Sequence, residues 1–182
     1  MYSISNAALT CLLTLLLSTV AAHAAQLCEP ANIPASTPTS QFTIHDIGTT
    51  VTDNKTGLMW KRCSEGQDWN GSTCTGIAAI YTWQTALQQV QNINGTGGFA
   101  GKKDWRVPNI KELASLVEVQ CSSPAINMTV FPETPWVFKF FWSSSSEASI
   151  SNQAWAVVPT GGNVNRGSKD ANGWVRLVRS GQ

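Results

Sequence analysis

Four cationic side chains lie within ten residues of one another, in the segment KKDWRVPNIK at 102–111. They are Lys102, Lys103, Arg106 and Lys111. Ammonium and guanidinium groups held this close together bind sulfate or phosphate through charge-assisted hydrogen bonds. The segment also has a structural interpretation, which we favour. Asp104 and Arg106 would then pair with the backbone or with each other, and Pro108 would set the start of a helix that Glu112 caps.

Cysteine is the second candidate for chemistry. Once residues 1–24 are set aside as a leader, an even set remains: Cys28, Cys63, Cys74 and Cys121. An even set in an exported protein predicts two disulfides, and four cysteines permit three connectivities. The short interval between Cys63 and Cys74, rich in Gly, Asn and Ser, favours that pair together with Cys28–Cys121. A zinc site is the weaker alternative, because it needs tightly spaced ligands and only His45 accompanies the cysteines.

The histidines and carboxylates of the sequence do not indicate a catalytic site. Both histidines, His23 and His45, lie early in the chain, and no GxSxG elbow is present, so a hydrolytic triad is not indicated. The carboxylates have no spacing that marks an acid–base pair. They include Asp53, Glu112, Glu118 and Glu147. We therefore predict no enzymatic activity, no bound metal and no cofactor.

The first residues of the chain predict export. Residues 7–22 read AALTCLLTLLLSTVAA without a charge and lead into Ala22-His23-Ala24, the small-x-small pattern that a signal peptidase accepts. The apolar stretch is shorter than the roughly 20 residues that span a bilayer, and no later stretch is longer, so we expect no membrane span. We therefore expect a signal peptide over 1–24 and a secreted or periplasmic mature protein.

Size and charge limit what the mature chain can be. Removal of the leader leaves about 158 residues, which suits one domain. Charged residues make up only 13% of the chain, which together with eight Trp indicates an aromatic-cored fold. Lys and Arg total 12 against 11 Asp and Glu. This near-balance gives no overall field that would gather nucleic acid.

Hydrophobic periodicity predicts strands at both ends of the domain and two helices between them. Residues 25–41, rich in Pro, Ser and Thr, are predicted to be an extended lead-in, and residues 42–182 the domain. Strands are expected at 42–47, around Val51, and at 58–60, 141–146, 154–158, 164–167 and 174–179.

The two helices have clear boundary signals. The first is expected over 81–93, with Thr82 as cap and Asn94-Gly95 as stop. The second begins at Asn109, whose partner Glu112 completes a capping box. Its apolar face is Ile110, Leu113, Leu116 and Val117. The order predicts an α+β fold of small antiparallel sheets, with both ends of the domain meeting in a sheet.

Four short blocks follow one another along the domain. They are TVTDNKTGLMW at 50–60, DWRVPNIKEL at 104–113, FWSSS at 141–145 and VRLVR at 175–179. Over residues 48–180 the chain resembles the DUF1566 family, also called the Lcl C-terminal domain. The resemblance implies a C-type-lectin-like fold, distantly similar to formylglycine-generating domains, and its adhesin member binds sulfated glycans. The late reactive cysteines of the formylglycine-generating enzymes have no counterpart, because no cysteine follows Cys121.

The resemblance also implies where a ligand would bind. C-type-lectin folds generally build the ligand face from late loops and strands, here the segment between Trp142 and Trp174. Amide and guanidinium groups suit sugar hydroxyls, and an indole suits the apolar face of a sugar ring. The expected ligand-binding residues are Asn163, Asn165, Arg166, Lys169 and Trp174, with Lys102 and Lys103 as a second group.

A plainer interpretation stands beside the sugar site. The Asn and Ser residues of the late segment are also common turn formers, and Trp is common in cores. We expect a core position for four of the eight tryptophans: Trp60, Trp105, Trp142 and Trp155.

Together these observations predict an exported, non-catalytic binding module of the adhesin type. Its partner would be a glycan, such as a sulfated polysaccharide, or a cell-surface or envelope protein, and self-association is left open. The first alternative is a structural or accessory subunit of a surface fibre or envelope assembly. The second is an enzyme related to the formylglycine-generating domains.

Overall fold

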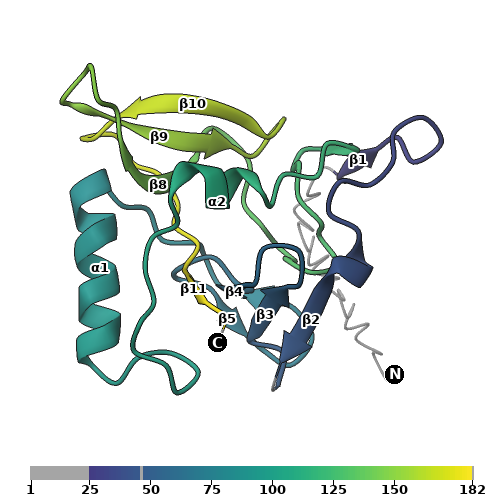
Figure 1. Cartoon of the computed structure of the whole chain (residues 1–182), viewed down its shortest axis with the longest axis horizontal. Helices are drawn as coiled ribbons and strands as arrows, with labels where there is room; N and C mark the ends of the chain where they lie inside the picture. The colour runs from purple at the N-terminus through teal and green to yellow at the C-terminus, as the bar shows by residue number, and fades with distance from the viewer. Residues whose placement is uncertain (1–24, 46, 182) are drawn as a thin grey trace, which may run out of the picture.

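The structure, a computed structural model, describes residues 25–45 and 47–181. The leader expected at 1–24 lies outside the described residues. The described chain forms small antiparallel sheets and two α-helices (Figure 1), which is the α+β organisation that the sequence predicts. No helix in 25–45 or 47–181 is both long enough and apolar enough to cross a membrane.

The largest sheet has four strands in the order β11-β4-β3-β2. The strands are β2 (Phe42–His45), β3 (Thr50–Asp53), β4 (Leu58–Lys61) and β11 (Val178–Ser180). Strand β11, from the end of the chain, places Val178 opposite Trp60 of β4. The two ends of the domain therefore meet in one sheet, as predicted. The strand expected over 42–47 ends earlier, at His45, because the chain turns there and Gly48 donates its N–H to the His45 carbonyl at 2.9 Å.

A three-stranded sheet in the order β10-β9-β8 forms the second layer (Figure 1). Its strands are β8 (Phe141–Ser146), β9 (Gln153–Val158) and β10 (Asn163–Ser168), close to the predicted ranges. The strand predicted over 174–179 is paired in regular fashion only from Val178 onward. Residues 175–177 instead form a buried connection, in which the carbonyls of Val175 and Leu177 accept from Glu65 N and Lys61 N.

Both helices begin where the sequence places their caps. Helix α1 (Trp83–Gly95) is capped by the Thr82 hydroxyl, and helix α2 (Ile110–Ala114) has the complete Asn109–Glu112 capping box. Helix α2 is shorter than its apolar face suggests. After Ala114 the backbone tightens to three-residue hydrogen bonds, from Leu116 N and Val117 N to the carbonyls three positions earlier. Leu116 and Val117, two residues of the predicted apolar face, therefore lie beyond the C-terminal end of α2.

The two helices pack on opposite faces of the three-stranded sheet. Neighbouring residues of a strand point to opposite faces. Ala156 of β9 lies in one core cluster with α1, and its neighbour Val157 lies in another with α2. Trp60, Trp105 and Trp142 are buried as predicted, whereas Trp155 is only half-buried.

The smaller elements are β1 (Leu27–Cys28), β7 (Cys121–Ser122), β5 (Asp68–Trp69), β6 (Cys74–Thr75) and the 3-10 turn η1 (Thr39–Gln41). One disulfide joins β1 to β7, and the other holds β6, which pairs with β5. Cys28 is bonded to Cys121 and Cys63 to Cys74, which is the connectivity favoured from the sequence. Because all four thiols are consumed, none is free to bind zinc.

Residues 25–41, the predicted lead-in, are tied to the domain along their length. We call them the strap. Strand β1 pairs with β7 beside the Cys28–Cys121 disulfide. Further along, the Glu118 carboxylate accepts from the backbone N–H groups of Ser36 and Thr37 at 2.9 and 2.8 Å. The strap is therefore part of the packed structure.

Candidate functional site

The predicted residues on β10 point to different sides of the sheet. Register pairs Arg166 with Trp155 and Asn165 with Ala156, so the side chains of Asn163 and Asn165 lie on one face and that of Arg166 on the other. All three are exposed. The Asn165 side-chain oxygen accepts the Arg166 N–H at 2.8 Å. The Arg166 guanidinium lies 5.7 Å from the centroid of the Trp155 ring.

Lys169 and Trp174 are largely committed to the fold. The Lys169 ammonium donates to Ser146 Oγ at 2.8 Å and to the Ser151 carbonyl at 2.7 Å, and it lies 4.5 Å from the Trp83 ring centroid. Trp174 is 7% exposed and packs beside Phe141. The small exposed part of the residue leaves little of it available to a ligand.

Ion pairs reduce the predicted basic cluster. Arg106 binds the Glu112 carboxylate through two bonds, of 2.6 and 2.7 Å. This hydrogen-bonded pair raises the pKa of Arg106. Asp104 binds Arg179 at 2.8 Å, which lowers the pKa of Asp104, so the predicted pairing of Asp104 with Arg106 does not form. The two side chains have partners on different elements instead.

Lys102 and Lys103 remain exposed, in the loop that follows α1. They take part in no ion pair with the described residues. This loop lies at the opposite end of the molecule from β9 and β10 (Figure 1). The structure therefore does not bring the seven predicted ligand-binding residues together into one site.

A groove of about 670 Å³ lies among the described residues. Four segments build it: the start of the strap, the Cys63–Cys74 hairpin with the residues after it, the loop at 123–128, and the loop at 133–137. Of the predicted ligand-binding residues only Trp174 lines it. Its other lining residues include Gln26, Gln67, Ile77, Glu133 and Trp136.

The polar groups of the groove divide into fixed and available ones. The Gln67 carboxamide is fixed, because it donates to the Glu133 carbonyl at 3.0 Å and accepts from Ser64 N at 3.2 Å. Gln26 donates to the carbonyls of Pro124 and Ile126. The exposed Glu133 carboxylate makes no hydrogen bond with any described residue and is available to a ligand. No Lys, Arg or His side chain lines the groove.

The rim of the groove is apolar and conformationally strained. Ile77 is 90% exposed, and Phe138, next to the lining residue Val137, is 98% exposed. Among the described residues, four that are not glycine have positive φ. Two of them, Ser123 and Glu133, line the groove, and a third, Phe138, follows the lining residue Val137. Such strain persists only where surrounding structure enforces it, and it is concentrated at functional sites.

Nothing in the described groove provides a catalytic pair. It has one exposed carboxylate and hydroxyl groups, without a histidine or a free thiol. No cluster of three His, Cys, Asp or Glu side chains that could hold a metal occurs in residues 25–45 and 47–181. The arrangement is suited to binding by contact and hydrogen bonding.

Sequence reasoning missed Gln67, Glu133 and Trp136. The loop at 133–137 carries no periodic pattern, and its position beside the hairpin depends on long-range contacts such as the Gln67–Glu133 bond. The one available signal was the clustering of Pro132, Pro135 and Trp136, which indicates an ordered, aromatic loop.

Sequence reasoning also missed two buried arginines. Arg176 is 1% exposed and Arg62 is 4% exposed. Arg62 donates to the carbonyls of Val130, Gly48 and Thr129, and it stacks 4.1 Å from the Trp69 ring centroid. The signal for Arg176 was its position between the apolar residues Val175 and Leu177. A charged side chain within a buried apolar segment can itself be buried.

Comparison with known proteins agrees with the sequence blocks. The family model of the Lcl C-terminal domain matches residues 49–179. No curated protein matches the chain closely enough to count as a relative. The matched range begins in the first sheet and ends in its closing strand β11, and it contains both helices and the three-stranded sheet. The chain therefore belongs to the Lcl C-terminal domain family.

Proposed function

We propose that this protein is an exported, non-catalytic binding module that recognises a glycan in the groove beside Trp136. The observation that carries the proposal is a groove of about 670 Å³ with indole walls, one available carboxylate and no basic side chain. Sites for small ligands commonly have volumes of about 300–1,000 Å³ and combine apolar walls with few polar groups. The two disulfides are consistent with a secreted or periplasmic location.

The chemistry of the groove favours an uncharged sugar. The half-buried Trp136 offers its indole to the C–H face of a sugar ring. The Glu133 carboxylate can accept hydrogen bonds from two neighbouring hydroxyls. A sulfated sugar would bring negative charge beside the Glu133 carboxylate, in a groove that no Lys, Arg or His side chain lines. We therefore expect binding of sulfated polysaccharide to involve exposed cations outside the groove, with Lys102 and Lys103 as the candidates.

A second proposal concerns the fold and is more specific than the α+β class. We propose a C-type-lectin-like architecture, supported by the order of strands, two helices and strands and by the joining of both ends in one sheet. The resemblance implied a ligand site on the late strands, but no residue that lines the groove belongs to β8, β9 or β10. The proposal of glycan binding therefore rests on the chemistry of the groove.

A protein partner is the second candidate. The apolar side chains at the rim, Ile77, Val137 and Phe138, are exposed by 45% or more. Solvent-exposed apolar groups gathered in one place are a feature of protein interaction sites. This observation fits an accessory subunit of a surface fibre or envelope assembly.

Binding to an array of neutral and sulfated glycans tests the first proposal. We expect the mature protein to bind neutral glycans, and Trp136→Ala and Glu133→Gln each to weaken binding at least tenfold. The matched controls are an Asn163→Ala/Asn165→Ala/Arg166→Ala variant and a Lys102→Ala/Lys103→Ala variant, both of which should bind normally. Loss of binding in either control but not in the groove variants would place the site elsewhere.

A heparin column and light scattering separate the remaining candidates. Retention on heparin at moderate salt that disappears in Lys102→Ala/Lys103→Ala would replace the neutral glycan by a sulfated one at a different site. Binding to no glycan, together with capture of an envelope protein that Phe138→Ser or Ile77→Ser abolishes, would favour the protein partner. Light scattering reports whether that partner is a second copy of the chain.

A further inference from the structure

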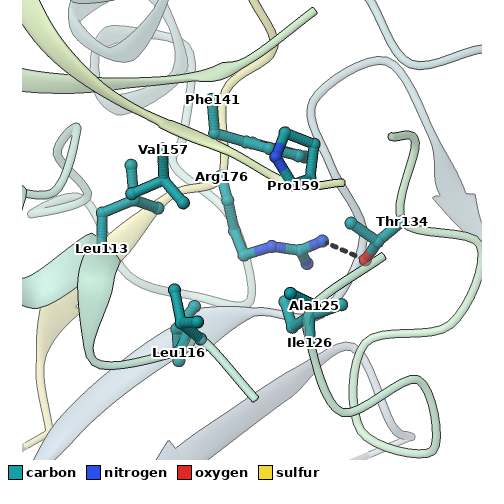
Figure 2. A pocket seen from close by; sticks show the side chains of 10 residues that line it. Leu113, Leu116, Ala125, Ile126, Thr134, Phe141, Val157, Pro159 and Arg176 are labelled. Carbon is teal, nitrogen blue, oxygen red and sulfur yellow. Dashed lines mark hydrogen bonds between the residues drawn. The ribbon is translucent and has the colours of Figure 1, made fainter. Parts of the chain in front are cut away.

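A small cavity lies beneath the three-stranded sheet, on the side of α2. Its volume is about 30 Å³. The walls are almost wholly apolar, and Arg176 is the one charged residue that lines it. Figure 2 shows the Arg176 side chain between Leu113 and Leu116 on one side and Ala125, Ile126 and Pro159 on the other, with its guanidinium turned toward Thr134.

The guanidinium of Arg176 has one N–H group without a hydrogen bond to any described residue. Its two terminal nitrogens donate to the carbonyls of Lys61 and Arg62 and to the hydroxyls of Ser64 and Thr134. Each acceptor is a neutral group. The Nε–H makes no hydrogen bond with any described residue. A buried guanidinium with no directly bonded carboxylate and one spare donor is an unusual arrangement, because buried charges are normally paired.

The surrounding charges do not neutralise it. Arg62 is also buried and bonds only to carbonyl oxygens. The one buried carboxylate nearby, on Glu65, bonds the Lys61 ammonium at 2.8 Å. Two buried guanidinium groups, of Arg62 and Arg176, and one buried carboxylate that is shared with the partly exposed Lys61 leave a net positive charge in a region of low dielectric, where unbalanced charge is costly. Burial accordingly lowers the pKa of Arg176 to about 9, which leaves it charged at neutral pH.

We propose that this cavity is a binding site for a small monovalent anion of the chloride type, held by the Arg176 guanidinium through its Nε–H. The anion would offset the unbalanced positive charge of the buried cations and accept the spare donor. About 10–15 Å³ of such space holds one water-sized particle, so about 30 Å³ admits a chloride ion and excludes a sulfate with its hydration shell. The apolar walls give a multivalent anion no further donors.

Thermal unfolding in different salts tests the site. The mature protein is heated at constant ionic strength while sodium gluconate is replaced by sodium chloride. An anion that binds only the folded state raises the melting temperature along a saturating curve. We expect a rise of roughly 4 °C at saturation. Bromide should act in the same way, and its anomalous X-ray scattering should show one ion beside Arg176 in crystals grown from bromide.

Cavity-filling variants provide the matched control. Ala125→Val and Val157→Ile add methyl groups to opposite walls of the cavity and leave Arg176 in place. We expect each to abolish the chloride response without preventing folding. The control position Ala86 lies on the buried face of α1 in a different core cluster, away from the cavity, so Ala86→Ser should keep the response.

Three results would overturn the proposal. The first is an identical melting temperature in chloride and gluconate for the unmodified protein. The second is a chloride response that persists unchanged in both cavity-filling variants. The third is a bromide-soaked crystal with only water beside Arg176. Should one variant fail to fold, the other variant and the bromide experiment still decide the question.

Discussion

Glu118 shows how a single residue ties the strap to the domain. Its side chain is 3% exposed, and its two oxygens accept from Ser36 N, Thr37 N, the Thr37 hydroxyl and Gln120 N. Burial alone would raise the pKa of Glu118, but these hydrogen bonds outweigh burial and lower it. The ionised form is therefore the one that the folded protein stabilises.

This residue should make stability depend on pH. Because its pKa is lower in the folded than in the unfolded chain, Glu118 stabilises the fold above its unfolded pKa of about 4.3, and this contribution is lost as pH falls through the folded value. Glu118→Gln should lower the free energy of unfolding at pH 7 by about 2 kcal/mol. Urea unfolding at pH 7 and pH 3 provides the measurement. The gap between variant and parent should shrink at pH 3, and an unchanged gap would contradict this account.

Asn109 tests the start of α2. Its side chain accepts from Glu112 N at 3.0 Å, and Glu112 reaches back to Asn109 N at 2.8 Å. Asn109→Ala should cost about 1 kcal/mol of stability, as the loss of an N-cap usually does, while Asn109→Ser should restore most of it. Chemical denaturation of both variants checks this. Equal losses for Ala and Ser would show that the hydrogen bond is not what matters.

Gly162 is required at its position by two independent features. Its φ is +74°, and a Cβ there would lie 2.2 Å from a methyl group of Val117. Gly162→Ala should therefore destabilise the protein by about 2 kcal/mol, from backbone strain and from overpacking. The double variant Gly162→Ala/Val117→Ala removes the clash and keeps the strain. Because the strain remains, the double variant should still be less stable than Val117→Ala alone, but by less than Gly162→Ala is destabilised relative to the parent. Urea unfolding measures both differences.

At the scale of elements, the sequence predicted what is local and periodic. The caps at Thr82 and Asn109, the strands at 141–146 and 154–158, and the hairpin near Gly161-Gly162 are each determined by neighbouring residues. The end of α2 and the 175–177 connection were not predicted correctly. At the end of α2 apolar spacing does not distinguish an α-helix from the three-residue turns that follow it, and in the 175–177 connection the partners are distant in sequence, such as Lys61 for Leu177.

The candidate site could be predicted only in part, for a physical reason. Trp174 was named and lines the groove, but Asn163, Asn165 and Arg166 were chosen from the C-type-lectin resemblance and from composition, without the strand register that divides them between two faces. Glu133 and Trp136 become neighbours of the Cys63–Cys74 hairpin only through tertiary contacts. Residue types alone do not contain that information.

The two disulfides should differ in what they contribute. Cys28–Cys121 closes a loop with a sequence separation of 93 residues, and Cys63–Cys74 one of 11. Loop-closure entropy predicts losses of about 5 and about 3 kcal/mol on their removal. We therefore expect Cys28→Ala/Cys121→Ala to have the lower melting temperature of the two double variants. The reverse order in scanning calorimetry would show that strain or residual structure in the unfolded chain dominates over loop length.

At the scale of the whole molecule, the last strand closes the domain. Strand β11 pairs with β4, Val178 is fully buried in the core with Trp60, and Arg179 bonds Asp104 in the loop that precedes α2. The connection at 175–177 carries Arg176 into the centre of the molecule. The end of the chain therefore holds the two sheets and the helix α2 together, although it is short.

Truncation tests this closing role. Deletion of residues 178–182 removes β11, the Arg179–Asp104 pair and the core side chain of Val178, whose loss alone should cost about 2 kcal/mol. The sum exceeds what a marginally stable domain tolerates, so we expect the tryptophan near-UV circular dichroism to be lost and urea unfolding to lose its cooperativity. Deletion of residues 181–182 removes one backbone bond, from Gly181 to Gly57, and should cost at most about 1 kcal/mol. If the longer deletion still unfolds cooperatively, the first sheet is stable without its C-terminal strand, and the two sheets must be held together by the buried arginines and the α2 face.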